Sequence, residues 1–152
     1  MLYGGEKENL HAIWDTNMLE QRVGGDGLAD AARWSETLVQ EIRNGSYAAA
    51  RAGWVKGLEL EDPEGSTAGV SGDANAFVCI EVLKGGVGAV QGKELSTEYY
   101  GAAVPVFEVQ IAKAGVRLAA WLNLIVTNTT GLEDGVEAGG RYVRPVMVND
   151  EL

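Results

Sequence analysis

The spacing of apolar residues along the chain indicates helices nearly throughout. Within "DGLADAARWSETLVQEIRNGS", residues 26–46, apolar side chains recur every three or four positions, which is typical of an amphipathic helix. Asp26 is a candidate N-cap and Asn44-Gly45 is a stop signal. The residues expected to form the buried stripe are Leu28, Ala31, Trp34, Leu38, Val39 and Ile42.

Three further helices are expected, separated by glycine-rich loops. "SYAAARAGWVKGLEL" favours a helix that ends before Asp62-Pro63, and a long helix is expected from Thr97 to about Ile125, kinked at Pro105. "EDPEGSTAGVSG" and "KGGVGAVQGKELS" favour loops. "DANAFVCIEVL" fits a helix or a buried strand, and its helical neighbours favour a helix. The residues expected in the core include Trp34, Trp54, Val104, Phe107, Ile111, Leu118 and Trp121.

This pattern predicts an all-α protein with one domain over residues 1–126 and an irregular tail over 127–152, where periodicity is weak. The chain has 152 residues, 46% apolar and 22% charged, which fits one soluble globular domain. It contains no run long enough to predict a membrane span, so no membrane association is expected. No basic-then-apolar leader of the secretory type is visible at its start.

The net charge of −10 argues against a protein that binds a phosphate backbone through a stripe of lysine and arginine. Bound divalent cations would reverse that argument, because they can be the largest local charges in a site. Lys113 and Arg117 lie four residues apart and could form a cationic face, although a solvated face is the default expectation. Tyr99 and Tyr100 could stack on bases, but core or rim aromatics are expected first.

The single histidine of the chain stands in "NLHAIWDT", four residues before an aspartate. On a helix, His11 and Asp15 face the same way, and both are ordinary zinc ligands. The spacing alone fits a polar pair on a helix surface equally well. A zinc site needs three or four protein ligands, so the residues support at most one partial site.

Cys79 and two glycosylation sequons bear on the compartment. Cys79 fits a small buried residue or half of a disulfide whose partner is not in the sequence. Asn44 and Asn128 each begin an Asn-x-Ser/Thr triplet, and the two together slightly favour a secretory history.

Several blocks of the sequence resemble one family. "NLHAIWDTNMLE", "GGDGLADAARWSETLVQEIRNGSY", "DANAFVC" and "YYGAAVPVFEVQIAKAGVRLAAWLN" are similar, in this order, to the S-one/P-one nuclease family, the zinc-dependent single-strand nucleases of fungi and plants. The resemblance runs from about Asn9 to Asn123 and implies the helical fold of the zinc-dependent phospholipase C and single-strand nuclease type. It is much more specific than the histidine and aspartate alone.

The resemblance implies a secreted enzyme with three zinc ions per complete domain. Such an enzyme hydrolyses phosphodiester bonds in single-stranded RNA and DNA to 5′-phosphorylated products and removes 3′-phosphates from nucleotides. His11 and Asp15 then ligate one zinc, and Thr16 and Asn17 are candidates for contacts with the substrate. The partners expected are single-stranded nucleic acid and 3′-nucleotides.

The chain departs from the family pattern in ways that keep other interpretations open. The N-terminal tryptophan and the further histidine and aspartate ligands of the family are missing, so the chain looks like the C-terminal half of the domain. The cysteine that would pair with Cys79 is also missing. The alternatives are therefore a catalytically inactive helical fragment, or a binding module that keeps part of the metal site. Apolar surface left uncovered would favour self-association.

Overall fold

A computed structural model describes residues 1–25 and 27–132, and the expected all-α architecture is confirmed. A short antiparallel hairpin, which was not expected, begins the chain, with β1 at Leu2–Tyr3 and β2 at Glu6–Lys7. The helical elements are α1 Leu10–Ala12, the π-helical turn η1 Ile13–Asn17, α2 Met18–Val23, α3 Leu28–Asn44, α4 Arg51–Trp54, α5 Pro63–Phe77, the π-helical turn η2 Val78–Val82, α6 Val87–Val90 and α7 Glu98–Thr127.

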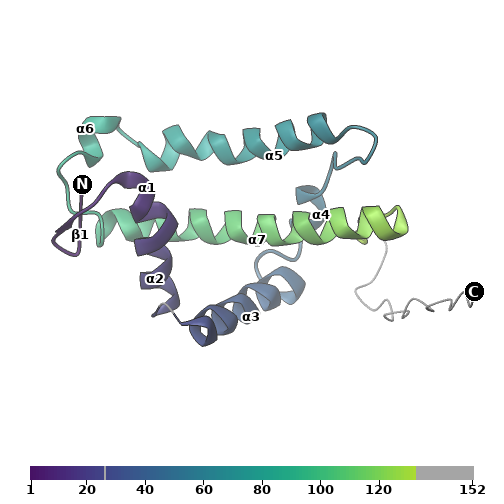
Figure 1. The fold of residues 1–152 in the computed structure, drawn as a ribbon, viewed down its shortest axis with the longest axis horizontal. Coiled ribbons are helices and arrows are strands. Elements are labelled where there is room, and N and C mark those ends of the chain that lie inside the picture. The colour runs from purple at the N-terminus through teal and green to yellow at the C-terminus, as the bar shows by residue number, and fades with distance from the viewer. Residues whose placement is uncertain (26, 133–152) are drawn as a thin grey trace, which may run out of the picture.

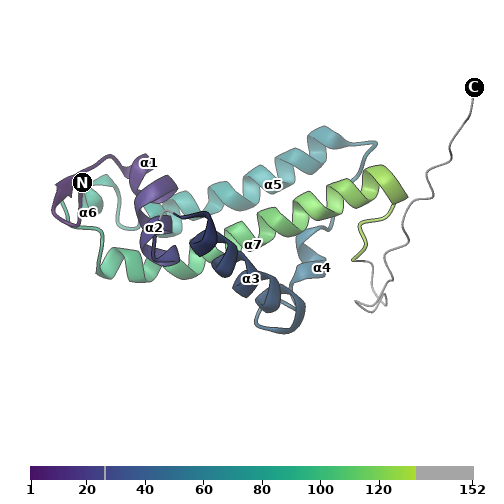
Figure 2. The same ribbon diagram turned by 60° about the horizontal axis from the view of Figure 1, so that its bottom comes forward.

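The long helix α7 runs along the middle of the molecule, and the other helices are arranged around it (Figure 1). α5 lies beside α7 and runs in the opposite direction, in both views (Figures 1 and 2). α1 and α2 cross the first half of α7, α3 lies on the side away from α5, and α4 packs against α7. The hairpin, α1 and α6 therefore gather at one end of the molecule.

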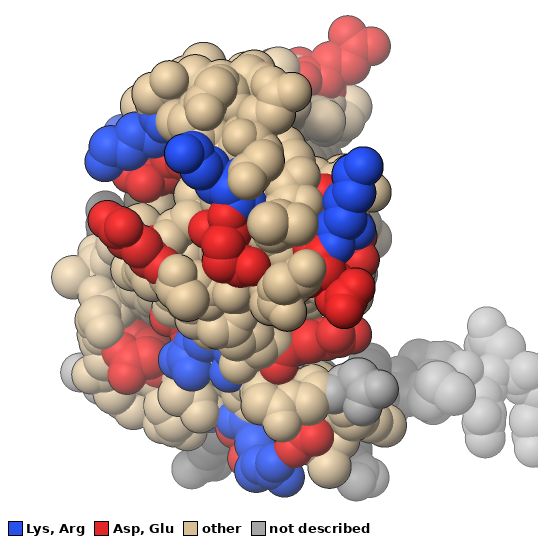
Figure 3. Space-filling view, turned by 90° about the vertical axis from the view of Figure 1, so that its left-hand side faces the viewer, with Lys and Arg blue, Asp and Glu red and all other residues tan. Residues whose placement is uncertain are grey.

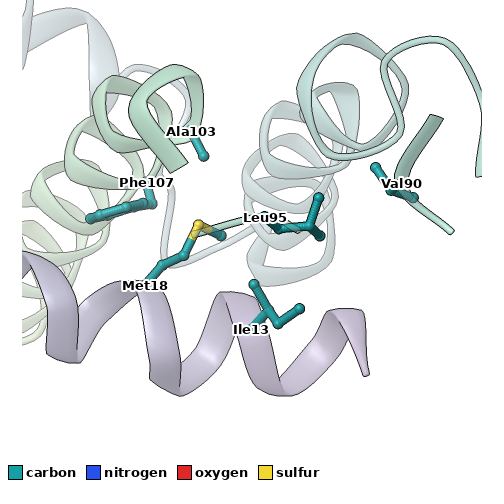
Figure 4. Close-up of a cluster of buried hydrophobic side chains, with 6 residues drawn as sticks. All are labelled: Ile13, Met18, Val90, Leu95, Ala103 and Phe107. Atoms are coloured by element: carbon teal, nitrogen blue, oxygen red, sulfur yellow. The ribbon is translucent and has the colours of Figure 1, made fainter. Parts of the chain in front are cut away.

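The first hydrophobic cluster joins the start of the chain to the start of α7. Its buried members are Ile13, Met18, Val90, Leu95, Ala103 and Phe107. In Figure 4 the side chains of Met18 and Phe107 approach each other between η1–α2 and α7. Ile13 and Met18 are fully buried. Because these two residues flank Asp15, the core fixes the backbone of Asp15 on both sides.

The second cluster lies along the other half of α7. It contains Val55 and Leu58, which follow α4, together with Val116, Ala120 and Leu124 of α7. Small residues at Ala112 and Ala120 are also fully covered, and such residues let neighbouring backbone approach closely.

The buried stripe of α7 differs from the expected one. Phe107 is buried and Ile111 and Trp121 pack against the clusters, but Leu118 is 63% exposed. The buried positions Ala112, Val116, Ala120 and Leu124 repeat every four residues, a face that sequence reasoning passed over because half of it is alanine. The helix continues through Pro105, where the carbonyl of a preceding turn goes without an amide donor.

The segment expected to be a loop before Asp73 is instead the body of α5. The side chain of Asp62 accepts a 3.0 Å hydrogen bond from the backbone N–H of Gly65, and Pro63 occupies the first turn. An N-cap followed by proline is a strong helix start. The prediction was wrong because glycine content outweighed this signal. The expectation of a helix for "DANAFVCIEVL" is confirmed, since it continues as α5 and η2.

The helix expected over "SYAAARAGWVKGLEL" is reduced to the four residues of α4 between turns. Gly57 has φ of 82°, a conformation that ends a helix and that glycine adopts without strain. Trp54 still packs in the second cluster, and its ring contacts Tyr47 at 5.7 Å between centroids.

The helix expected after Asp26 is confirmed as α3, although its apolar stripe is only partly used. Leu38 is buried, Trp34 and Ile42 pack against the clusters, and Leu28 is 88% exposed. The described cap residue is Gly27, and Asp26 lies outside the described residues. Most of the expected tail, residues 133–152, also lies outside them.

α7 is long and apolar enough to cross a bilayer if only its length and composition are considered. Core helices of globular proteins pass the same test. Lys113 and Arg117 of this helix form ion pairs with α5, and its apolar residues contribute to both clusters. The absence of membrane association stays a prediction.

Candidate metal centre

His11 and Asp15 lie together on the surface, one helical turn apart. The Nε2 atom of His11 lies 2.9 Å from Oδ2 of Asp15, and the two side chains are 88% and 59% exposed. Both donors are therefore open to a metal ion from solvent. The structure thus confirms that the two side chains converge. Their role as metal ligands stays a prediction.

The wide turn η1 explains how the pair is presented. In a regular α-helix, Ile13 and Met18, five residues apart, would point about 140° away from each other. Here the N–H of Met18 donates to the carbonyl of Ile13, a π-type bond, and both side chains are fully buried. Asn9 caps α1 by accepting a 2.9 Å hydrogen bond from the N–H of Ala12. The π turn therefore anchors two core residues while Asp15 stays exposed between them.

Trp14, which precedes Asp15, is held by a hydrogen-bond chain. Its Nε1–H donates to the hydroxyl of Tyr99 over 2.8 Å, and that hydroxyl donates to the carbonyl of Val82 over 2.9 Å. The Trp14 and Tyr99 rings meet edge to face, with centroids 6.2 Å apart. Burial raises the pKa of Tyr99 above its usual value despite the Trp14 hydrogen bond, so the hydroxyl stays protonated and remains a donor.

An apolar groove of about 440 Å³ opens beside Asp15, between η1–α2, α5 and α7. Its lining includes Trp14, Phe77, Phe107 and Ile111. Gln110 also lines it, and among the described residues the Nε2 atom of Gln110 is buried without a hydrogen-bond partner. The groove therefore combines apolar walls with one unsatisfied amide donor.

The donor set of the pair fits one zinc ion in part. Two ligands of a tetrahedral zinc lie about 3.3 Å apart at bond lengths of about 2.0–2.1 Å, so the 2.9 Å pair would need to open only slightly. Across residues 1–25 and 27–132, no group of three or more His, Cys, Asp or Glu side chains could hold a metal ion. Cys79 is free and exposed, which differs from the expectation of a buried residue. The geometry thus brings two candidate ligands together, with no third beside them among the described residues.

Several of the basic side chains on the described surface pair with carboxylates, among them Arg22, Lys113 and Arg117. Figure 3 shows one end of the molecule, where basic and acidic side chains are interspersed rather than segregated. Lys113 and Arg117 do not form a free cationic face, because both bind Asp73 of α5 at 2.9 Å. Burial alone would raise the pKa of Asp73, but the hydrogen bonds and charges of these two residues outweigh it and lower the pKa. The default expectation of a solvated face was therefore wrong.

The other candidate residues are placed but not given a role. Thr16 is exposed and Asn17 half-buried on the same turn as Asp15, and their contact with substrate stays a prediction. Asn44 and Asn128 are exposed, as glycosylation requires, and their modification also stays a prediction. Tyr99 and Tyr100 pack against the first cluster, which supports the structural interpretation of both.

The helical fold and the exposed His11–Asp15 pair at a π turn place the chain in a class, that of helical proteins with a candidate metal site. Comparison with known proteins makes the assignment specific, because the S1/P1 Nuclease family model matches residues 1–127. The chain belongs to this family. It is 44% identical to Nuclease S1 of Aspergillus oryzae over 125 residues, which cover 82% of this chain and 44% of that protein.

Two further relatives show the same pattern of coverage. Nuclease PA3 of a Penicillium species and Nuclease P1 of Penicillium citrinum are each 42% identical over 123 residues, covering 81% of this chain and 46% of the relative. The chain thus spans about half the length of the curated relatives it matches. The family resemblance read from the sequence is confirmed.

Proposed function

We propose that this chain contributes one zinc-binding pair to a nuclease that hydrolyses phosphodiester bonds of single-stranded RNA and DNA. The observation that supports this most directly is the exposed His11–Asp15 pair, with its donor atoms 2.9 Å apart, in a chain of the S1/P1 nuclease family. The proposal includes 5′-phosphorylated products, 3′-nucleotidase activity and zinc dependence. Secretion also belongs to it, supported by the two exposed sequons at Asn44 and Asn128.

In this proposal His11 and Asp15 hold a zinc ion through Nε2 and a carboxylate oxygen. Bound zinc would generate hydroxide near neutral pH and stabilise charge on the phosphate oxygens. Other residues of the same turn position the pair and are open to the substrate. Ile13 and Met18 anchor the turn in the core, and Thr16 and Asn17 lie where a substrate could reach them. Zinc ligation would also explain how a chain of net charge −10 approaches a polyanion.

The test uses a chimera in which this chain is joined to the part of Nuclease S1 that the match leaves uncovered. Turnover of single-stranded DNA, RNA and a 3′-nucleotide is measured together with zinc content, for the chimera and for its His11→Ala and Asp15→Ala variants. Loss of one ligand should reduce metal affinity and activity by at least about tenfold. Asp30→Ala, on the exposed surface of α3, is the matched control. Near-normal zinc content and turnover in both ligand variants would refute the assignment.

The second candidate function is that of a helical binding module without catalysis, and the incomplete ligand set favours it. It predicts that single-stranded oligonucleotides bind to the chain with an affinity that does not depend on zinc. Equilibrium binding with and without a chelator distinguishes the two candidates.

A further inference from the structure

The two π-helical turns in the described part of the chain are both connected to one residue. Trp14 lies in η1 and Val82 lies in η2, and the hydroxyl of Tyr99 on α7 accepts from the first and donates to the second. π-Helical turns are rare, and they often occur at functional sites. The turn η1 carries Asp15. The turn η2 provides the Val82 carbonyl to which the Tyr99 hydroxyl donates.

We propose that Tyr99 is the positioning residue that holds the π turn and thereby keeps the His11–Asp15 pair in register for its metal ion. This inference rests on the proposed function for its metal, although the geometry that Tyr99 sets can be measured without metal. Tyr99 does not touch the pair and acts through Trp14, whose side chain it fixes.

The contacts around Tyr99 favour this role over simple packing. The ring could fill its site as phenylalanine, yet its hydroxyl uses both a donor and an acceptor function in a partly buried position. If the hydroxyl is removed, the indole N–H of Trp14 and the carbonyl of Val82 both lose a partner. Trp14 can then reorient, and since Asp15 is the next residue, the turn that presents it loses a restraint.

His11 provides the probe, because it is the only histidine in the sequence. Its imidazole gives one set of NMR resonances in the whole chain, so their shifts report on the pair without ambiguity. The variants are Tyr99→Phe and Trp14→Phe, each of which removes one partner of the same hydrogen bond. Tyr47→Phe is the matched control, since Tyr47 also packs against a tryptophan, Trp54, but in the region of the second cluster.

Without metal, Tyr99→Phe and Trp14→Phe should shift the His11 imidazole resonances, and Tyr47→Phe should leave them unchanged. With zinc chloride added, both site variants should show an apparent zinc affinity on the order of tenfold weaker than the unchanged chain. The double variant should be no weaker than either single variant, because all three lose the same hydrogen bond. Far-UV circular dichroism and the thermal midpoint show whether each variant is folded.

The failures of the two proposals are distinguishable. If zinc at the highest soluble concentration does not affect the His11 resonances of the unchanged chain, zinc ligation by the His11–Asp15 pair in the proposed function fails, and the metal-free shifts still decide the role of Tyr99. If Tyr99→Phe leaves the His11 resonances and the zinc affinity unchanged, the positioning role is overturned. If Tyr99→Phe unfolds, Trp14→Phe decides the same question, because it removes the other partner of the hydrogen bond and keeps an aromatic ring at position 14.

Discussion

The carboxylate of Asp73 and the guanidinium of Arg117 lie 2.9 Å apart and join α5 to α7. Lys113, one turn earlier on α7, binds the same carboxylate. The two cations are only 14% and 13% exposed, so their charges depend on this single partner. Arg117 also donates a 2.9 Å hydrogen bond to the carbonyl of Trp54. The polar contact thus connects α5, α7 and the end of α4.

Asp73→Asn should destabilise the chain by about 2–3 kcal/mol, because two largely buried cations lose their counter-charge. Urea unfolding followed by circular dichroism measures the difference. Asp30→Asn, which breaks an exposed pair with Arg33 on α3, should cost less than about 1 kcal/mol. Equal effects of the two variants would contradict the role given to Asp73.

Acid should loosen the N-terminal hairpin through Glu94. Hydrogen bonds from Ser96 and from the backbone N–H groups of Gly4 and Gly5 lower the pKa of Glu94 from 4.5 to about 2. A lowered pKa means that the stabilisation is complete above the unfolded-state value and is lost as the pH falls from about 4.5 to about 2.

The stability difference between the unchanged chain and Glu94→Gln should therefore shrink as the pH falls from about 6 to about 3. Thermal midpoints of the two proteins at several pH values measure it. A difference that stays constant over this range would show that the charge of Glu94 is not what holds the hairpin.

The sequence predicted most elements whose signal is local, with α5 as the exception, and missed features that depend on tertiary contacts. The amphipathic spacing of α3 and the apolar length of α7 marked both helices, and the "NLHAIWDT" block marked the His11–Asp15 pair that the structure brings together. The π turn could not be predicted, because it arises when Ile13 and Met18 are both buried in one core. The role of Asp73 was missed because its partners lie 40 and 44 residues away.

The corrected stripe of α7 gives a direct stability test. Phe107→Ala should cost about 3–5 kcal/mol, since its ring is buried in the first cluster. Leu118→Ala should change stability by less than about 0.5 kcal/mol, because that side chain is mostly exposed. Denaturant unfolding of both variants measures the contrast. A large loss of unfolding free energy for Leu118→Ala would contradict the exposed position of Leu118 and would support the buried stripe expected from the sequence.

Self-association is expected through the exposed apolar residues of α7. Leu118, Leu122 and Ile125 recur at spacings of four and three and are each more than half exposed. Replacing Leu122 and Ile125 by serine should lower the apparent mass in sedimentation experiments, while Glu36→Ser on α3 should not. A chain that stays monomeric at all protein concentrations would contradict the expected self-association through α7.

Under oxidising conditions exposed Cys79 should form a covalent dimer that Cys79→Ser abolishes.

The chain by itself should show no appreciable nuclease activity and should bind zinc weakly. His11 and Asp15 leave two positions of a tetrahedral ion to water, and residues 1–25 and 27–132 offer no third ligand beside them. Weak binding follows because metal affinity and selectivity depend on a nearly complete set of protein ligands. The assay measures hydrolysis of single-stranded DNA and RNA at mildly acidic pH with added zinc, beside His11→Ala. Zinc-dependent activity that disappears in His11→Ala would show instead that a second copy of the chain, or further acidic residues of this chain, supply the missing ligands.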